Sequence, residues 1–370
     1  MSTPRPLAGK RVVEFAQFIA GPTAAQLLAD FGAEVIKVET ATGDGSRHLP
    51  GTDHGSVYSR SFNTSKASVV IDTRSEEGRA ALDALLASAD ALVCNVAPGG
   101  LKRLGLEPAT LRARYPRLVA TLISGYGQQD DRTCMDTIAQ CESGFAWLNG
   151  AEDGTPRIST SWPTDFFSGL YAGLSTAMAL LDPARSQGKG CLVDISMMEV
   201  AGAMLLGPAA LLVSEGGVPG APTGNRDRAS APSGVYPCAD GHVYIYGGLD
   251  PYWAKLGPLV GGRASTLAER LAATAEFERI VTDWTAGRTQ AEVLAEMERL
   301  AIPAGPVRHP VEALARLRGL RPGAISSELP TGEHVPAFPA LFDGQRILRD
   351  PTPRVGEPRR NGERNREKRR

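Results

Sequence analysis

The stretch RVVEFAQFIAGPTAAQLLADFGAEVIKVE, residues 11–39, decides the fold. Its first six residues and its last six have the apolar and β-branched content of buried strands. Between them, small and apolar residues recur at helical spacing, from Pro22, which suits a first helical turn, to Gly32. Two strands joined by a single helix predict a parallel βαβ unit.

The same alternation continues along the first half of the chain. Strand patterns recur at 67–72, 91–96, 118–124 and 191–196, and a long helical pattern covers 165–181. Thr73 followed by Glu76 resembles a capping box for the helix after the third strand. We therefore predict the α/β class, with a Rossmann-like, doubly wound sheet that has helices on both faces.

A second, smaller α+β domain is expected after a segment rich in glycine and proline. The sequence predicts a large domain over 1–214, completed by about 326–356, a linker at 215–232, a small domain at 233–325 and a basic tail at 357–370. Within the small domain, residues 233–246 read as a hairpin that turns at 239–241, and helical patterns run to about residue 300.

Composition and charge narrow the class of protein. The 370 residues carry a net charge of -1, which favours neither nucleic acid nor an anionic membrane as a partner. The tail from 359 to 370 is basic and is interpreted as a solvated end, with a nucleic-acid role as the less favoured alternative. The start lacks a signal-peptide core, and no apolar run reaches the roughly 18 residues of a membrane span.

Cysteine and histidine usage indicates a protein of the reducing cytoplasm without a structural metal. The five cysteines are an odd number with no C-x-x-C pair, which argues against a disulfide framework or a zinc site. The five histidines lack metal-ligand spacing, so no metal site is predicted.

The loops after the strands limit the ligands that the sheet could bind, because open parallel sheets bind ligands beyond the carboxyl ends of their strands. Residues 17–22 do not form the G-x-G-x-x-G fingerprint, and P-loop and G-x-S-x-G motifs are also absent, which disfavours a dehydrogenase, an ATPase and a serine hydrolase. Glycines follow two strands at 95–100 and 124–128. They either let the backbone approach a ligand or form ordinary turns.

Asp165 is the candidate catalytic residue. An aspartate in the first turn of a helix most often only caps free amides. Two features favour more: Gly169, on the same helix face, is expected to leave open space beside the carboxylate, and aromatic neighbours such as Trp162 could exclude water. A desolvated carboxylate is a good nucleophile, provided that local amides keep it ionised.

Nine segments together form a recognisable pattern that covers nearly the whole chain: 6–39, 43–47 (GDGSR), 63–66 (NTSK), 95–106 (NVAPGGLKRLGL), 124–128 (SGYGQ), 135–144, 163–181, 188–199 and 302–307. In these segments the chain resembles the family III CoA transferases, which include formyl-CoA transferase, carnitine CoA transferase and α-methylacyl-CoA racemase.

The resemblance implies a fold, an assembly and a chemistry. It implies two domains joined by linkers and a homodimer of interlocked rings. Coenzyme A would be a substrate rather than a permanently bound cofactor, exchanged between an acyl-CoA and a free carboxylic acid through an aspartyl anhydride and thioester on Asp165. Amides near Ala20 and Gly21 and those of 124–127 are the candidate oxyanion donors, with Arg47 a further cation near the phosphates. The implied CoA contacts are Ile19, Ala20, Lys66, Asn95, Val96, Arg103, Gly125, Tyr126, Met135 and Asp136.

Several positions depart from the family's patterns. The racemases have a histidine where this chain has Met135, which cannot carry a proton, so racemisation is disfavoured. The formyl-CoA branch has a glycine-rich loop where this chain has 230–234, which is not glycine-rich. After residue 357 the family usually continues into a further helix, whereas this chain has a basic polar tail, which leaves C-terminal docking open. The alternatives are a 2-methylacyl-CoA racemase or epimerase that uses Asp165 and Asp136, and a non-catalytic CoA-binding scaffold.

Overall fold

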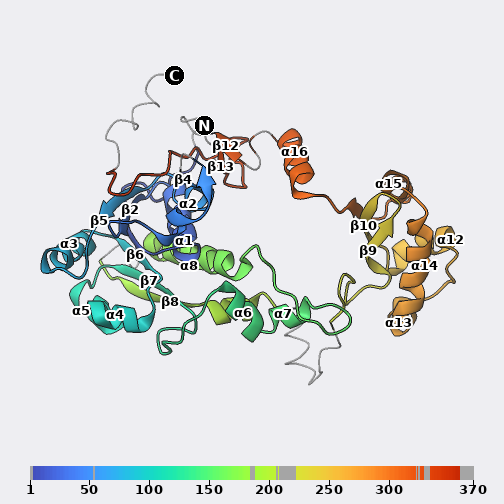
Figure 1. Ribbon diagram of the computed structural model, residues 1–370, viewed down its shortest axis with the longest axis horizontal. Coiled ribbons are helices and arrows are strands. Elements are labelled where there is room, and N and C mark those ends of the chain that lie inside the picture. Colours follow the sequence, from blue (N-terminus) through green and yellow to red (C-terminus); the bar gives the residue numbers. More distant parts are fainter. Residues whose placement is uncertain are drawn as a thin grey trace. The chain divides into compact units, whose positions relative to one another are not determined.

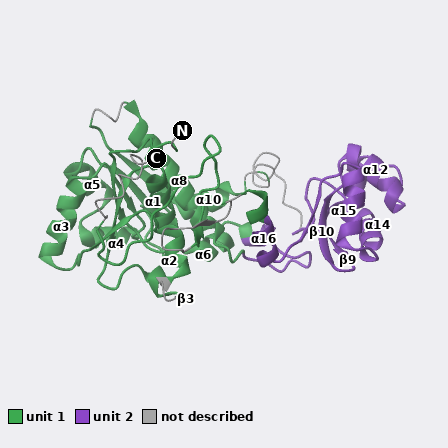
Figure 2. Cartoon of the chain, turned by 90° about the horizontal axis from the view of Figure 1, so that it is seen from above, with its two compact units in different colours: residues 1–145, 159–217, 317–370 green, residues 146–158, 218–316 purple. Residues whose placement is uncertain are grey.

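The computed structural model describes residues 3–52, 55–183, 188–205, 207, 222–321, 323, 326–328 and 334–358. The chain divides into two compact units (Figure 2). Unit 1 contains residues 1–145, 159–217 and 317–370, and unit 2 contains 146–158 and 218–316. Residues 146–158 thus belong to unit 2 although they precede the predicted linker, and the predicted domain boundaries stay predictions.

Unit 1 is built on a parallel six-stranded sheet, which confirms the predicted α/β class. Its strands are β1 (Arg11–Phe15), β2 (Glu34–Glu39), β5 (Ala67–Val70), β6 (Ala91–Cys94), β7 (Val119–Ser124) and β8 (Cys191–Ser196). They lie in the order β5-β2-β1-β6-β7-β8. Chain order therefore reverses between β1 and β6, which is the doubly wound arrangement. Every sheet strand begins within one residue of its prediction.

Helices cover both faces of this sheet (Figure 1). On one face, α1 (Ala20–Asp30), α8 (Pro163–Leu181) and α10 (Met197–Ala203) bury small and aliphatic residues against alternate strand positions. On the other face lie α3 (Glu76–Ala87), α4 (Pro98–Leu104) and α5 (Pro108–Arg114). The remaining elements of the unit are η1 (Gly45–His48), β3 (Gly51–Thr52), β4 (Gly55–Ser56), α2 (Val57–Phe62), α6 (Asp136–Glu142), β12 (Ser326–Glu328) and β13 (His334–Pro336).

The C-terminal segment docks onto unit 1, which answers the question that the departure from the family left open. Ser68 N donates to the carbonyl of Glu357 at 2.9 Å, and Gly356 N donates to Ser68 Oγ at 3.0 Å. Arg349 forms an ion pair of 2.6 Å with the buried Asp30 of α1. Residues 349–357 therefore pack along β5, at the edge of the sheet. The basic tail 359–370 lies outside the described residues.

Unit 2 contains the predicted hairpin of β9 (Ser233–Cys238) and β10 (Gly241–Tyr246), extended by β11 (Ala304–Pro306). Its helices are α12 (Asp250–Val260), α13 (Leu267–Ala272), α14 (Thr274–Ala286) and α15 (Gln290–Arg299), while α7 (Phe145–Leu148) and α16 (Pro310–Leu320) cross the limits of the unit. Its separate core is built on residues such as Trp253, Phe277 and Val281.

Two local predictions need correction or fall outside the structure. Ser75, not Thr73, caps α3, because the Ser75 hydroxyl accepts from Gly78 N at 2.9 Å. The sequence after residue 196 also has an apolar helical pattern to about residue 213, of which positions 206 and 208–213 lie outside the described residues. None of the helices in the described ranges is long and apolar enough to cross a membrane.

Candidate active site

The site lies at the carboxyl edge of the sheet, where β1 and β6 lead into loops that diverge. Asn95, directly after β6, forms two hydrogen bonds with the backbone of Gln17, the second residue after β1. Its Oδ1 accepts from Gln17 N at 2.9 Å, and its Nδ2 donates to Gln17 O at 2.8 Å. Helix α1 begins three residues later, at Ala20, without a side-chain cap. The first amides of a helix have no intrahelical partner, so this helix start can offer donors at the switch point.

Two glycines bring α8 directly against α1. A Cβ on Gly169 would lie 2.6 Å from both Ala20 O and Thr23 Cβ, and a Cβ on Gly173 would lie 2.9 Å from Leu27 Cδ1. Gly169 faces the first turn of α1 and Gly173 faces a later turn, so α1 and α8 run in the same direction. The first turn of α8 therefore lies beside the loop that precedes Ala20. The expectation that Gly169 leaves open space beside the carboxylate was wrong, because α1 fills that space.

The cap of α8 comes from Asp136, the first residue of α6. Trp162, at the N-cap position, has left-handed backbone angles (φ 51°) and makes no side-chain cap. Asp136 Oδ1 instead accepts from Thr164 N at 2.7 Å and from Asp165 N at 3.2 Å. Its other oxygen accepts from Gln140. Asp136 is 2% exposed, so its carboxylate is a buried part of the framework.

Asp165 is therefore not a capping residue, and its carboxylate lacks the amides that were expected to keep it ionised. Within the described chain, no hydrogen-bond donor contacts this carboxylate. Burial, and then the negative charge of Asp136, raise the pKa of Asp165 from 3.8 to about 7. The electrostatic part of the sequence prediction was wrong, because the helix-start amides donate to Asp136. A half-buried carboxylate without hydrogen bonds is poised between its neutral and its nucleophilic form near neutral pH.

Tyr58 on α2 is a site residue that the sequence did not reveal. Burial, followed by the charges of Asp165, Asp44 and Asp136, raises its pKa to about 12. Its ring meets Trp162 edge-on, with 5.4 Å between the centroids. Tyr58 lies in a short helix far from Asp165 in sequence, and no local pattern distinguishes it from a core tyrosine.

A buried ion network holds the loop between β1 and α1. Lys37 Nζ contacts Glu14 at 2.6 Å and Asp44 at 2.9 Å, and donates to Ala16 O at 2.8 Å. Asp44 Oδ1 in turn accepts from Phe18 N at 3.2 Å, and Phe18 adopts a left-handed φ of 63°. A strained backbone beside an active site requires such support from its surroundings. The network thus fixes the residues that precede α1.

Lys66 and Arg47, which the resemblance places near CoA, have partners inside the protein. Lys66 Nζ pairs with Glu14 at 2.7 Å and donates to Pro22 O at 3.0 Å, and burial lowers its pKa to about 8. Arg47 pairs with Glu39 at 2.8 Å and donates to Pro353 O at 3.0 Å. A phosphate contact by either side chain would require these internal partners to be replaced.

The remaining predicted contacts lie along the same edge of unit 1. Ile19 and Ala20 are buried at the start of α1, Val96 follows β6, and Arg103 is exposed on α4. Gly125 follows β7, next to Tyr126, whose hydroxyl donates to Glu142 at 2.7 Å. Met135 precedes α6 and is 57% exposed. The structure thus brings the predicted residues to the carboxyl edge of the sheet, except Lys66, which directly precedes the parallel strand β5 and so lies at its amino end. Lys66, Asn95 and Asp136 are engaged within the framework.

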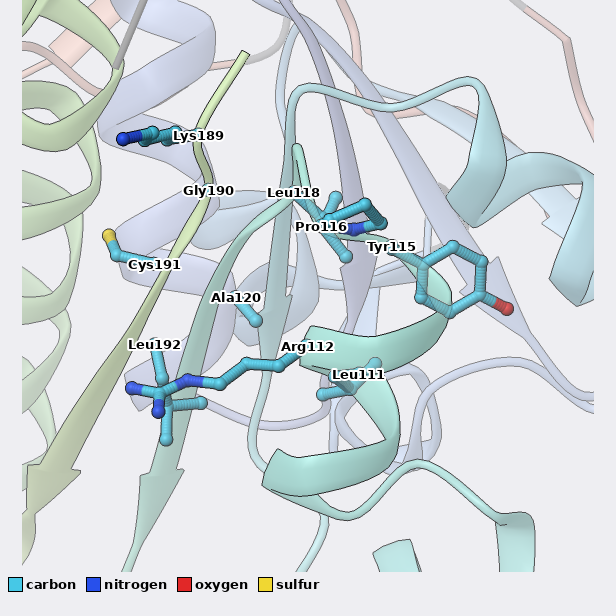
Figure 3. Close-up of a pocket in the computed structure, with 10 residues that line it drawn as sticks. All are labelled: Leu111, Arg112, Tyr115, Pro116, Leu118, Ala120, Lys189, Gly190, Cys191 and Leu192. Atoms are coloured by element: carbon cyan, nitrogen blue, oxygen red, sulfur yellow. The ribbon is translucent and has the colours of Figure 1, made fainter. Parts of the chain in front are cut away.

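A separate pocket of about 490 Å³ opens at the opposite edge (Figure 3). It is lined by residues at the starts of β7 and β8, among them Leu118 and Leu192, and by Arg112 of α5 and Lys189. None of the predicted site residues lines it. Among the residues described, no three His, Cys, Asp or Glu side chains are grouped to hold a metal ion.

Comparison with known proteins identifies the class to which this fold and site belong. The family model for CoA-transferase family III matches residues 7–359, and the chain therefore belongs to this family. This confirms the resemblance predicted from the sequence motifs, and with it the class of CoA-transferring enzymes.

Particular relatives agree with this assignment. The succinate–glutarate CoA-transferase of Agrobacterium fabrum is 32% identical over 95% of this chain and 93% of its own. The succinyl-CoA–D-citramalate CoA-transferase of Chloroflexus aurantiacus is 32% identical over 84% of this chain and 81% of its own. A crystal structure of a CAIB/BAIF family protein from Brucella suis matches with a TM-score of 0.84 and 30% identity, over 96% of this chain and 97% of that one.

Proposed function

We propose that this enzyme moves coenzyme A from an acyl-CoA to a free carboxylic acid, with Asp165 as the nucleophile. One observation carries the proposal: the amides at the start of α8 donate to Asp136, so the Asp165 carboxylate is left half-buried and receives no hydrogen bond from the residues that the structure describes. A carboxylate that is used only for structure would have accepted those amides. Its freedom from partners suits a group that must form and release covalent bonds.

The reaction would proceed through acyl exchange at Asp165. A carboxylate oxygen attacks the thioester carbonyl, the carbon–sulfur bond breaks, and a mixed anhydride and CoA thiolate form. The thiolate then attacks the aspartyl carbonyl, which releases the first carboxylate and leaves an aspartyl-CoA thioester. The acceptor carboxylate attacks this thioester, and the thiolate released attacks the acceptor's acyl carbonyl, which regenerates Asp165. Proton transfer is not required, because each nucleophile and each leaving group is an anion.

The charge that develops on the carbonyl oxygen needs donors beside Asp165. The uncapped start of α1, at Ala20 and Gly21, supports this role, because the contact of α1 with Gly169 brings that helix start next to the first turn of α8. The exposed Arg103 on α4 remains the best candidate in the predicted set for a CoA phosphate, since Lys66 and Arg47 have internal partners.

The racemase alternative needs a second group that can take and return a proton. Asp136 was the candidate, but both of its oxygens accept hydrogen bonds in the framework beneath α8. We therefore favour transfer over racemisation.

We also propose that the enzyme is a homodimer in the cytoplasm. Helix α8 carries an exposed apolar stripe at helical spacing, formed by Phe167, Tyr171, Leu174, Met178 and Leu181, which are 41–57% exposed. A stripe of this kind on an otherwise buried helix favours an interface with another copy of the chain. The five cysteines are free thiols, as is usual in a reducing compartment.

Trapping of the covalent intermediate tests the nucleophile. Incubation with an acyl-CoA and then borohydride or hydroxylamine should label Asp165, and the Asp165→Asn variant should bind CoA without being labelled. A label on another residue, or full turnover by the variant, would overturn the assignment.

The mass of the protein in solution tests the dimer. Leu174→Glu should shift a dimer toward monomer, whereas Glu77→Lys on the exposed face of α3 should not.

A further inference from the structure

We propose that the acyl group accepted beside Asp165 is apolar and lacks a second carboxylate. This inference rests on the proposed function, because it concerns the donor that Asp165 attacks. It separates this chain from the relatives whose names contain succinate or succinyl-CoA. Two observations carry it: an exposed apolar rim lies around Asp165, and the charges that act on Asp165 and its titratable neighbours are negative.

The rim consists of four large side chains that remain exposed in unit 1. Trp162, the N-cap residue of α8, is 43% exposed, and Phe166, which directly follows Asp165 in that helix, is 44% exposed. Met135, at 57%, adjoins Asp136, which binds the amide of Asp165. Phe18, at 41%, lies in the loop at the start of α1. Exposed apolar side chains gathered around a desolvated carboxylate are the usual lining of a site for an apolar ligand.

Neighbouring negative charges raise the pKa of the titratable groups near Asp165. The pKa of Asp165 is raised by burial and then by the charge of Asp136, and the pKa of Tyr58 is raised by burial and then by the charge of Asp165. For Cys134, burial and the charges of Glu142 and Asp165 together raise the pKa. The causes of these three pKa shifts include no lysine or arginine.

Four cations in the segments near Asp165 already have acidic partners within unit 1. Lys37 and Lys66 share Glu14, Arg47 pairs with Glu39, and Arg132 pairs with Asp130 at 2.8 Å. A distal carboxylate on the acyl group would therefore enter an apolar, negatively charged part of unit 1 in which these four cations are already engaged. An uncharged acyl chain would bury its surface against the rim instead.

Single-turnover formation of the aspartyl-CoA thioester provides the test, because every acyl donor produces this same adduct. Butyryl-CoA and phenylacetyl-CoA are compared with succinyl-CoA and glutaryl-CoA, and the adduct is trapped with hydroxylamine and located by mass spectrometry. We expect the second-order rate constant of adduct formation to be at least tenfold higher for the uncharged donors. Equal or faster reaction of succinyl-CoA overturns the inference. If no donor labels Asp165, the proposed function fails instead.

Two variants of Met135 test whether the rim contacts the acyl group. Met135→Arg introduces a guanidinium into the rim and should raise the rate for succinyl-CoA relative to butyryl-CoA at least tenfold. Met135→Leu is the matched control and should keep the preference of the natural enzyme. If Met135→Arg leaves the preference unchanged, the rim does not face the acyl group and the inference is wrong.

Discussion

Replacing Asp165 by asparagine should make the folded protein more stable at pH 8 while abolishing transfer. The pKa of Asp165 rises from 3.8 to about 7 on folding, so ionisation favours the unfolded chain. The stability that the protonated group provides is complete below about pH 4 and is lost as the pH rises to about 7. A difference of this size corresponds to about 4 kcal/mol at most, at roughly 1.4 kcal/mol per pH unit. Solvent screening of a half-buried side chain reduces this to about 2 kcal/mol.

The assay is thermal or urea unfolding of the natural protein and of Asp165→Asn between pH 4 and pH 8.5. The two proteins should have similar stability near pH 4 and diverge as the pH rises, with no further divergence above about pH 7.5. Glu298→Gln, which removes an exposed carboxylate from α15, controls for the change in net charge and should show no such divergence. A natural protein that is the more stable of the two at pH 8 would refute the electrostatic account of the site.

Three further changes test the framework around Asp165. Asp136→Asn removes the neighbouring negative charge and should lower the pH at which the acylation rate is half-maximal, measured from kcat/KM between pH 5 and pH 9; an unchanged profile would contradict the coupling. Gly169→Ala places a methyl group against α1 and should cost about 1–3 kcal/mol in urea unfolding, whereas Gly202→Ala in α10, with open space around it, should not destabilise. Arg349→Ala leaves the buried Asp30 without its cation and should cost about 3–5 kcal/mol; a loss below 1 kcal/mol would mean that the pair contributes little.

The sheet was predictable because each strand carries its own signal. A parallel strand is buried on both faces, so runs such as those at 91–96 and 118–124 are apolar almost throughout and stand out without knowledge of their neighbours. The hairpin of unit 2 was equally clear, since a turn separates two β-branched and aromatic runs. Helix starts were less reliable: Ser75 and Thr73 are chemically similar, and only the backbone decides which hydroxyl meets an amide.

The site was predictable in its members but not in their roles. Asp165 and Asp136 were both found, yet which carboxylate caps α8 depends on how α6 approaches that helix, over a sequence distance of 29 residues. The tight contact at Gly169 and the participation of Tyr58 likewise arise from helices that meet only after folding. Sequence patterns report the local backbone, whereas the electrostatics of a site depends on partners that are distant along the chain.

The docking of residues 349–357 has a consequence for how the chain is made. Ser68 and Asp30 receive their partners from residues about 290 to 320 positions later in the chain, which leave the ribosome much later. Until then the edge strand β5 lacks its neighbour and Asp30 lacks its cation, so a nascent or shortened chain would present an open sheet edge to other molecules. Synthesis of the whole of unit 2 falls within this interval, which ends when residues 349–357 dock onto unit 1.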